Sequence, residues 1–67
     1  MTYVDSSNLE QVGYDNDNME LHVIFKDGSL YVYLDVPAQI YEELLVAPSK
    51  GSYLNREVKG VYNYDKR

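Results

Sequence analysis

The chain has 67 residues, a formal net charge of −5 and no cysteine. This length allows a single domain over residues 1–67, and the lack of cysteine excludes disulfide bonds and cysteine-based metal sites. Such a short chain buries only about 60% of the surface that its unfolded form exposes, so we expect a compact apolar core or a homo-oligomer. Tyrosine supplies eight of the nine aromatic residues, and many tyrosines are expected at the edge of the core.

Acidic residues are concentrated in the first half of the chain. Residues 1–36 contain seven acids and one lysine, whereas residues 37–67 contain five basic and four acidic residues. A long nucleic acid is held by several phosphate contacts at once, so the overall acidity argues against that mode of binding. A local basic patch for one or two phosphates remains open.

The first residues carry neither a basic region nor an apolar run, so we expect no signal peptide. No apolar run approaches the roughly 20 residues of a membrane span. We therefore expect a soluble, cytoplasmic protein that does not act at a membrane.

Apolar residues alternate in the first half of the chain, as in half-buried strands. The strands are expected at residues 9–14, 19–25 and 30–34. The run of Asp and Asn at residues 15–18 is typical of a turn, because both residue types tolerate left-handed backbone. Asp27-Gly28 indicates a hairpin between the second and third strands.

This hairpin admits two registers. A two-residue loop at 27–28 pairs Phe25 with Leu30 and places six apolar residues on one face, with Tyr31 and Tyr33 on the other. A three-residue loop with a glycine bulge shifts the pairing by one residue and moves both tyrosines to the apolar face of the neighbouring strand. We expect the two-residue loop, because it gathers more apolar residues on one side.

Two short helices and a last strand follow. Pro37 suits the first turn of a helix, and Pro48 ends it, because the residue before a proline disfavours helical backbone. Ser49 can cap the second helix, and Gly60 can stop it. Buried helix residues are expected at Ile40, Leu44, Leu45, Leu54 and Val58, the last strand at 61–64, and a frayed tail at Lys66 and Arg67.

The resulting order is β-β-β-α-α-β. It predicts an α+β fold, in which two short helices pack on one face of a small antiparallel β-sheet. The apolar strand face and the buried helix residues would then form one core between two layers.

Several short motifs resemble the KTSC domain in their order and spacing. They are Val12-Gly13-Tyr14-Asp15, Phe25 with Gly28, Tyr31-Val32-Tyr33, Val36-Pro37, and Ala47, Ser49, Gly51, Tyr53, Asn55, Lys59 and Tyr62. The KTSC domain is a short module known as a single-domain protein and at the C-terminus of some lysyl-tRNA synthetases. The resemblance covers nearly the whole chain, and it implies the RNA binding that has been suggested for the family.

The first candidate site is formed by Tyr31 and Tyr33, with His22 nearby. Aromatic faces accept any nucleic-acid base, so this group can serve as a stacking platform. The alternative is that the tyrosines pack under a terminal strand or a helix.

The second candidate site is the start of the second helix at Ser49, Lys50 and Gly51. The first amides of a helix lack intrahelical partners and attract anions, and Lys50 adds positive charge. Gly51 lets a ligand approach the backbone. The alternative is an ordinary helix cap in a tight turn.

The third candidate is the polar side of the second helix, with Tyr53, Asn55, Arg56 and Lys59. Asn55 and Lys59 are four residues apart and share a side of the helix. Beside an anion site, this side can read a nucleotide. The alternative is a solvated helix face.

Catalytic and metal chemistry is not expected. An acidic turn that starts at Asp15 does not match the EF-hand calcium loop, whose sixth and twelfth positions need Gly and Glu but hold Glu20 and Lys26. His22 is the single histidine, and no persuasive Ser/His/Asp set accompanies it. We expect no catalytic residue, no metal and no cofactor.

Two functions remain. The first is a non-catalytic binding module for a phosphate-bearing nucleotide, either an RNA end or a small signalling nucleotide that a bacterial or phage protein sequesters. The second is a protein-interaction or inhibitor domain that uses a tyrosine-rich surface, since tyrosine is favoured where interfaces bind most strongly.

Overall fold

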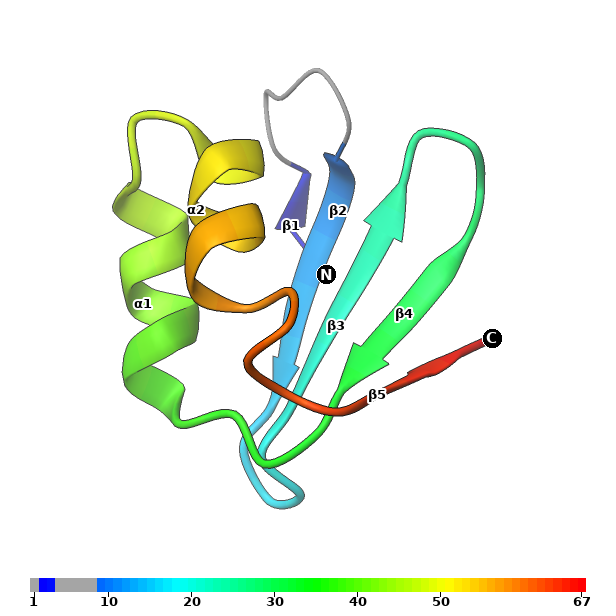
Figure 1. The fold of residues 1–67 in the computed structure, drawn as a ribbon, viewed down its shortest axis with the longest axis vertical. Helices are drawn as coiled ribbons and strands as arrows, with labels where there is room; N and C mark the ends of the chain where they lie inside the picture. The colour runs from blue at the N-terminus through cyan, green and yellow to red at the C-terminus, as the bar shows by residue number, and fades with distance from the viewer. Residues whose placement is uncertain (1, 4–8) are drawn as a thin grey trace.

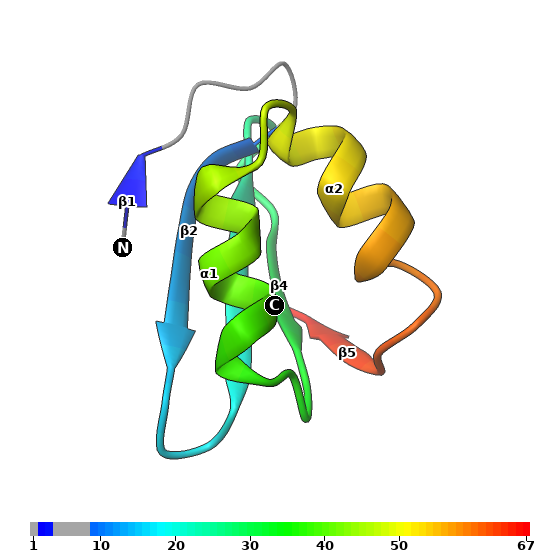
Figure 2. The same cartoon turned by 90° about the vertical axis from the view of Figure 1, so that its left-hand side faces the viewer.

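The computed structural model describes residues 2–3 and 9–67, so residues 1 and 4–8 of the expected domain lie outside the described part. The elements are β1 (Thr2–Tyr3), β2 (Leu9–Asp15), β3 (Glu20–Phe25), β4 (Leu30–Tyr33), α1 (Ala38–Val46), α2 (Lys50–Glu57) and β5 (Tyr64–Lys66). The five strands form one antiparallel sheet in the order β1-β2-β3-β4-β5. Both helices cover the same face of this sheet (Figures 1 and 2). The predicted α+β class and β-β-β-α-α-β order are confirmed, and β1 adds a short strand at the start.

A β-bulge places Leu9 and Val12 on the same face of the sheet. The pairing of β2 with β3 shifts between Leu9 and Gln11, so Glu10 is an extra residue on β2. A bulge of this kind interrupts the alternation of side chains. Residues three positions apart on a regular strand would face opposite sides of the sheet. Because of the bulge, Leu9 and Val12 are both fully buried.

The hairpin between β3 and β4 has the three-residue loop, so the expected two-residue loop is wrong. Phe25 N–H donates to Ser29 O at 3.0 Å, and Gly28 N–H donates to Phe25 O at 2.9 Å. Gly28 has φ +91°, a backbone conformation that glycine adopts without steric cost. The chain can therefore turn over residues 26–28.

This register turns both β4 tyrosines toward the helices. Tyr31 lies opposite Val23, and Tyr33 lies opposite Leu21. Tyr33 is only 2% exposed, so its ring fills space in the core. Val32 is also buried, but it pairs with His22 and faces the other side of the sheet.

The helices begin and end close to where the sequence indicates. Pro37 is the N-cap of α1, and Pro48 follows one residue after its C-cap. Ser49 caps α2, because its Oγ accepts the N–H of Ser52 at 3.3 Å. The second helix ends three residues before Gly60, which has φ +79°.

The last strand lies further along the chain than residues 61–64, because the four residues after α2 form a turn. Lys66 pairs with Tyr31 inside β5. Arg67 N–H donates to Leu30 O at 2.7 Å. The expected frayed tail is therefore wrong, and the end of the chain forms the edge of the sheet beside β4 (Figure 1).

One apolar core fills the space between the sheet and the helices. Its buried members are Leu9, Val12, Leu21, Val23, Tyr33, Val36, Leu44, Tyr53, Leu54 and Val58. The predicted pair Leu54 and Val58 is confirmed, with exposures of 1% and 0%. In the part of the chain that the structure describes, neither helix is long and apolar enough to cross a membrane.

Candidate functional site

A pocket of about 640 Å³ opens between the β3–β4 hairpin, β5 and the turn after α2. It is lined by Phe25, Lys26, Asp27, Ser29, Tyr31, Tyr33, Lys59, Gly60 and Tyr64. Its volume lies in the range of about 300–1,000 Å³ that is usual for small-molecule sites. The pocket therefore has room for a ligand of that size.

Four aromatic rings form one wall of the pocket. The ring of Tyr31 is stacked with Tyr33 at 6.3 Å between centroids and meets Phe25 edge-on at 5.2 Å. Tyr64 lies 5.2 Å from Tyr31 and 5.6 Å from Tyr33. Tyr33 is buried, whereas Tyr64 is 54% exposed. Tyr64 therefore presents the most open ring face of this wall.

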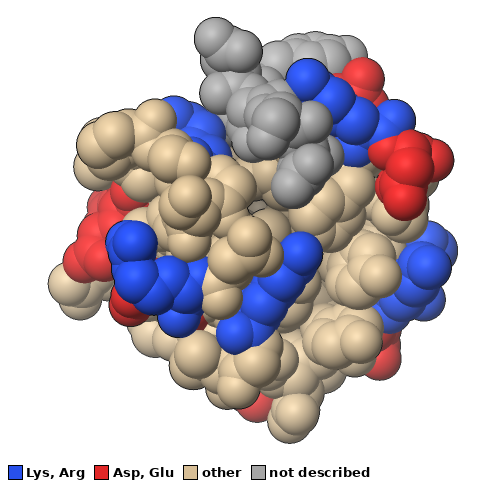
Figure 3. Space-filling view, turned by 45° about the horizontal axis from the view of Figure 1, so that its top comes forward, with Lys and Arg blue, Asp and Glu red and all other residues tan. Residues whose placement is uncertain are grey.

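Lysine side chains surround the end of the wall that is nearest to the hairpin. Lys59 Nζ lies 5.1 Å from the centroid of Phe25, and Lys66 Nζ lies 5.7 Å from the centroid of Tyr31. Lys26 lines the pocket directly after Phe25. On the face shown in Figure 3, basic side chains stand around uncharged surface, and the acidic ones lie mainly at the periphery. The pocket is thus basic in a protein that is acidic overall.

Asp27 is the acidic residue in the pocket lining. Its Oδ1 accepts the N–H of Ser29 at 2.9 Å and also the Ser29 hydroxyl. These hydrogen bonds, foremost that of the Ser29 hydroxyl, lower the pKa of Asp27, and the charge of Lys66 adds a smaller effect. Asp27 therefore stays ionised and is engaged in shaping the hairpin.

Three of the residues expected from the sequence meet in this pocket: Tyr31, Tyr33 and Lys59. The two tyrosines come from β4, and Lys59 comes from the turn after α2. Gly60 follows Lys59 in the lining. The tyrosine platform and one of the expected cations therefore belong to a single site.

The start of α2 lies outside the pocket lining. Ser49 Oγ is engaged by the N–H of Ser52, and Lys50 Nζ donates to Ala47 O at 3.3 Å. Gly51 is half-buried. These contacts are those of a capped helix that is tied to the end of α1.

The remaining expected residues are also separate from the pocket. Tyr53 is 7% exposed, and its hydroxyl donates to Glu43 Oε1 at 2.8 Å. Burial, together with this bond to Glu43, raises the pKa of Tyr53 to about 12. Arg56 Nε bonds Glu57 Oε2 at 3.0 Å, and Asn55 is exposed on the outer side of the helix.

Sequence reasoning missed Tyr64, Lys26 and Lys66 as site residues. Lys66 was assigned to a tail, and Tyr64 to the end of a strand expected earlier in the chain, at 61–64. The signal that marks them is the pairing of β5 with β4, which sets Tyr64 beside Tyr33 and Lys66 beside Tyr31. That pairing joins residues more than 30 positions apart, so no local pattern reveals it.

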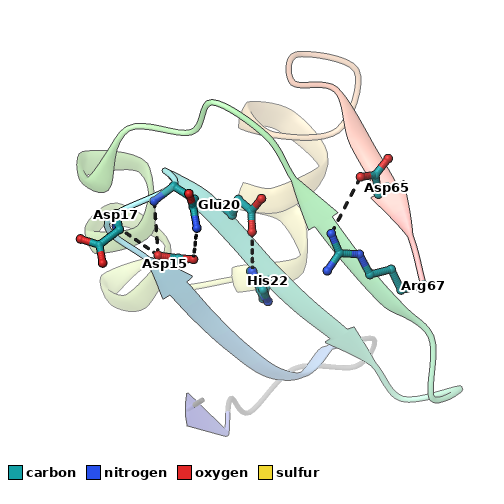
Figure 4. Close-up of polar contacts among 7 residues, drawn as sticks. Asp15, Asp17, Glu20, His22, Asp65 and Arg67 are labelled. Atoms are coloured by element: carbon teal, nitrogen blue, oxygen red, sulfur yellow. Dashed lines mark hydrogen bonds and ion pairs between the residues drawn. The ribbon is translucent and has the colours of Figure 1, made fainter.

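His22 lies on the other face of the sheet, opposite Val32. Its Nε2 is 3.2 Å from Glu20 Oε1, as Figure 4 shows together with the polar contacts of Asp15. His22 therefore does not join the tyrosine platform. In residues 2–3 and 9–67, no group of three or more His, Cys, Asp or Glu residues is placed to hold a metal ion.

Comparison with known proteins identifies the family. Residues 5–62 match the model of the KTSC domain. The chain is 39% identical over 59 residues to a protein of Tsukamurella paurometabola, and the match covers 88% of each. The chain belongs to the KTSC domain family.

Two further relatives extend this comparison. The crystal structure of a KTSC domain protein from Yersinia pestis has a TM-score of 0.90 and 35% identity, covering 96% of this chain and 90% of that one. The lysine–tRNA ligase of Nostoc punctiforme is 34% identical over 61 residues, which are 91% of this chain. The matched region is 11% of the length of that ligase.

Proposed function

We propose that this chain is a non-catalytic binding module for a phosphate-bearing nucleotide, either an RNA end or a small signalling nucleotide that the protein sequesters. The observation that carries this proposal is the combination of an open aromatic wall and basic side chains in one pocket. Aromatic rings stack on bases of any sequence. Lysine supplies a compact positive charge for phosphate.

The charges of the pocket favour an anionic ligand. Lys26, Lys59 and Lys66 stand around it, and Asp27 is the acidic member of its lining. Elsewhere the chain has an excess of acidic residues. An anion is therefore drawn to this pocket and repelled from much of the remaining surface.

The lysine–tRNA ligase relatives support the RNA-end form of the proposal. By its name, that enzyme joins lysine to tRNA, and a segment of it resembles this chain. The segment is a small share of the ligase, so we take from it only an association with RNA. The catalytic activity of the ligase is not part of the proposal.

The lining of the pocket also supports a binding role without catalysis. Its polar groups are tyrosine hydroxyls, lysines, one serine and one aspartate that is already hydrogen-bonded. The histidine, His22, lies on the opposite face of the sheet. We place this module in the cytoplasm, where a chain without cysteine needs no disulfide bond for stability.

A second candidate function is protein interaction through the exposed tyrosine surface. Val61 is 60% exposed and Tyr64 is 54% exposed, and they lie three residues apart. A partner protein, or a second copy of the chain, would bury both. Tyrosine burial depends little on salt, whereas phosphate contacts weaken as salt rises.

The test is a titration of the purified protein with a mixture of the four ribonucleoside monophosphates, followed by native mass spectrometry. We expect a complex that carries one nucleotide per chain and weakens as salt rises from about 50 to about 200 mM. Lys59→Gln should weaken it, whereas Lys50→Gln serves as the matched control at the competing helix start. A protein that retains no nucleotide but forms a salt-insensitive oligomer would favour the second function instead.

A further inference from the structure

The pocket has two chemically different ends. Phe25 and Tyr31 form the end beside the hairpin, where Lys59 and Lys66 lie over their rings. Tyr33, two residues further along β4, and Tyr64 form the other end, with ring centroids 6.3 Å and 5.2 Å from that of Tyr31. No lysine or arginine of the described residues lies over the ring of Tyr33 or Tyr64. The basic groups are therefore gathered at one end.

The strand pairing fixes this polarity. Lys66 lies opposite Tyr31, and Tyr64 lies opposite Tyr33. Their side chains face the helices because residues two apart on a strand share a face. β5 thus places Lys66 at the first end of the pocket and the exposed ring of Tyr64 at the second.

We infer that the pocket binds a free nucleoside monophosphate, with its terminal phosphate among Lys26, Lys59 and Lys66 and its base against Tyr64. This inference rests on the proposed nucleotide-binding function and names its ligand class. A mononucleotide has one anionic end and one planar end, joined by a sugar. The pocket presents the complementary arrangement.

The charge at the basic end fits a single terminal phosphate. Three lysines act against one carboxylate, that of Asp27. A terminal phosphate carries a charge of about −1.5 to −2 near pH 7. A nucleotide inside an RNA chain is instead flanked by two phosphodiesters, each with a single charge. The second of them would need a phosphate contact beyond the base. At that end the pocket lining offers Tyr33 and Tyr64, and no lysine or arginine of the described residues lies over either ring.

Because Tyr64 is exposed, its replacement can weaken base binding without unfolding the chain. Tyr64 is 54% exposed at the edge of the sheet, whereas Tyr33 is 2% exposed. Tyr64→Ala should therefore leave a folded chain that has lost the stacking surface. Tyr64→Phe keeps the ring, and Val61→Ala is a matched change at a neighbouring exposed residue.

The experiment compares binding of the full chain to AMP, GMP, CMP and UMP, to their nucleosides, and to hexaribonucleotides with and without a 5′-phosphate, by isothermal titration. We expect at least one monophosphate to bind about tenfold or more tighter than its nucleoside and to weaken as salt rises, with a smaller salt slope than a polynucleotide that contacts several phosphates. We expect neither hexamer to bind more tightly than that monophosphate. Tyr64→Ala should weaken binding about tenfold, whereas Tyr64→Phe and Val61→Ala should change it by less than about twofold.

The outcomes are distinguishable. A hexamer that binds about tenfold more tightly than every monophosphate, with a salt slope of several phosphates, would overturn the mononucleotide inference and keep the nucleotide-binding function. Equal affinity for nucleoside and monophosphate would overturn the assigned phosphate position. Binding of none of these probes would overturn the proposed function itself. If Tyr64→Ala does not fold, Lys66→Gln provides the second test, because it removes the phosphate contact at the same strand.

Discussion

Tyr33 on β4 lies directly opposite Tyr64 on β5, with their ring centroids 5.6 Å apart. The two rings have different environments, because Tyr33 is 2% exposed and Tyr64 is 54% exposed. The buried ring is part of the core, and the exposed ring continues the same aromatic surface into the pocket. This pair therefore joins the folded interior to the candidate site.

The two members of this pair should separate stability from binding. Tyr33→Ala should lower the free energy of unfolding by about 3–5 kcal/mol, the usual loss for removing a large buried ring. Tyr64→Ala should lower it by less than about 1 kcal/mol, because its ring is half in solvent. Urea denaturation of both variants measures the difference. Equal losses would mean that Tyr64 is a core residue and not a binding surface.

Replacing a lysine beside the pocket should weaken nucleotide binding, whereas replacing a lysine away from it should not. Lys59→Gln and Lys66→Gln should each weaken nucleotide binding by about 5- to 30-fold, which corresponds to ~1–2 kcal/mol. Lys50→Gln should leave the affinity within about twofold, because Lys50 Nζ bonds Ala47 O at the start of α2. Titration at low salt measures all three. A loss confined to Lys50→Gln would move the phosphate site to the helix start.

Tyr14 should stabilise the segment that leads into α1. Its hydroxyl donates to the carbonyl oxygen of Val36, and its ring stacks on Tyr41 at 5.5 Å between centroids. Tyr14→Phe keeps the stacked ring and leaves this acceptor without its donor, so it should cost about 1–2 kcal/mol of unfolding free energy. Tyr41→Phe is the control, because no hydrogen bond joins the Tyr41 hydroxyl to another described residue. Equal effects of both changes would show that the hydroxyl of Tyr14 contributes nothing specific.

Acid should weaken the contact between the helices at Glu43. The hydrogen bond from Tyr53, and then that from Gln39, lower the pKa of Glu43. A carboxylate with a lowered pKa in the folded state contributes stability that is fully present above its ordinary pKa of about 4.3 and is lost as the pH falls through the folded value. Glu43→Gln should therefore flatten the decline of stability below about pH 4.3.

Glu42→Gln is the matched control for this acid effect. Glu42 is the exposed neighbour of Glu43 on α1, so its replacement should leave the decline of stability in place. Thermal unfolding across the acid range measures both variants. An unchanged curve for Glu43→Gln would show that the bond to Tyr53 does not depend on the carboxylate charge.

The helices could be placed from the sequence because their signals are local. Pro37 precedes the first helical residue, Pro48 follows the end of α1, and Ser49 caps α2. Each of these residues acts through its own backbone geometry or on amides within three positions. The buried pair Leu54 and Val58 follows from helical spacing alone.

The hairpin register could not be placed in the same way. Counting apolar residues favoured a face without Tyr31 and Tyr33, yet the large ring of Tyr33 fills the core. Burial of a tyrosine ring removes a large apolar area from water, and its hydroxyl can remain near the surface. Asp27 also shapes the loop, because its carboxylate accepts hydrogen bonds from Ser29. The Asp27-Gly28 pair indicates a turn but not the number of residues in the loop.

The candidate site was predicted in part. Tyr31, Tyr33 and Lys59 were expected as binding residues, and all three line one pocket. Tyr64 lines that pocket, and Lys66 lies over the Tyr31 ring beside it, only through the pairing of β5 with β4. Such a pairing depends on the turn after α2, whose length sets the position of the last strand. The sequence pattern of three exposed residues in β5 carries no signal of its own.

The most direct test of nucleotide binding in the pocket is an NMR titration of the isotope-labelled chain with a nucleoside monophosphate. The account predicts the largest amide shift changes in residues 25–31, 59–60 and 64–66, with residues 49–51 nearly unchanged. Changes centred on 49–51 would place the phosphate at the helix start. No saturable change anywhere in the chain would contradict nucleotide binding as its function.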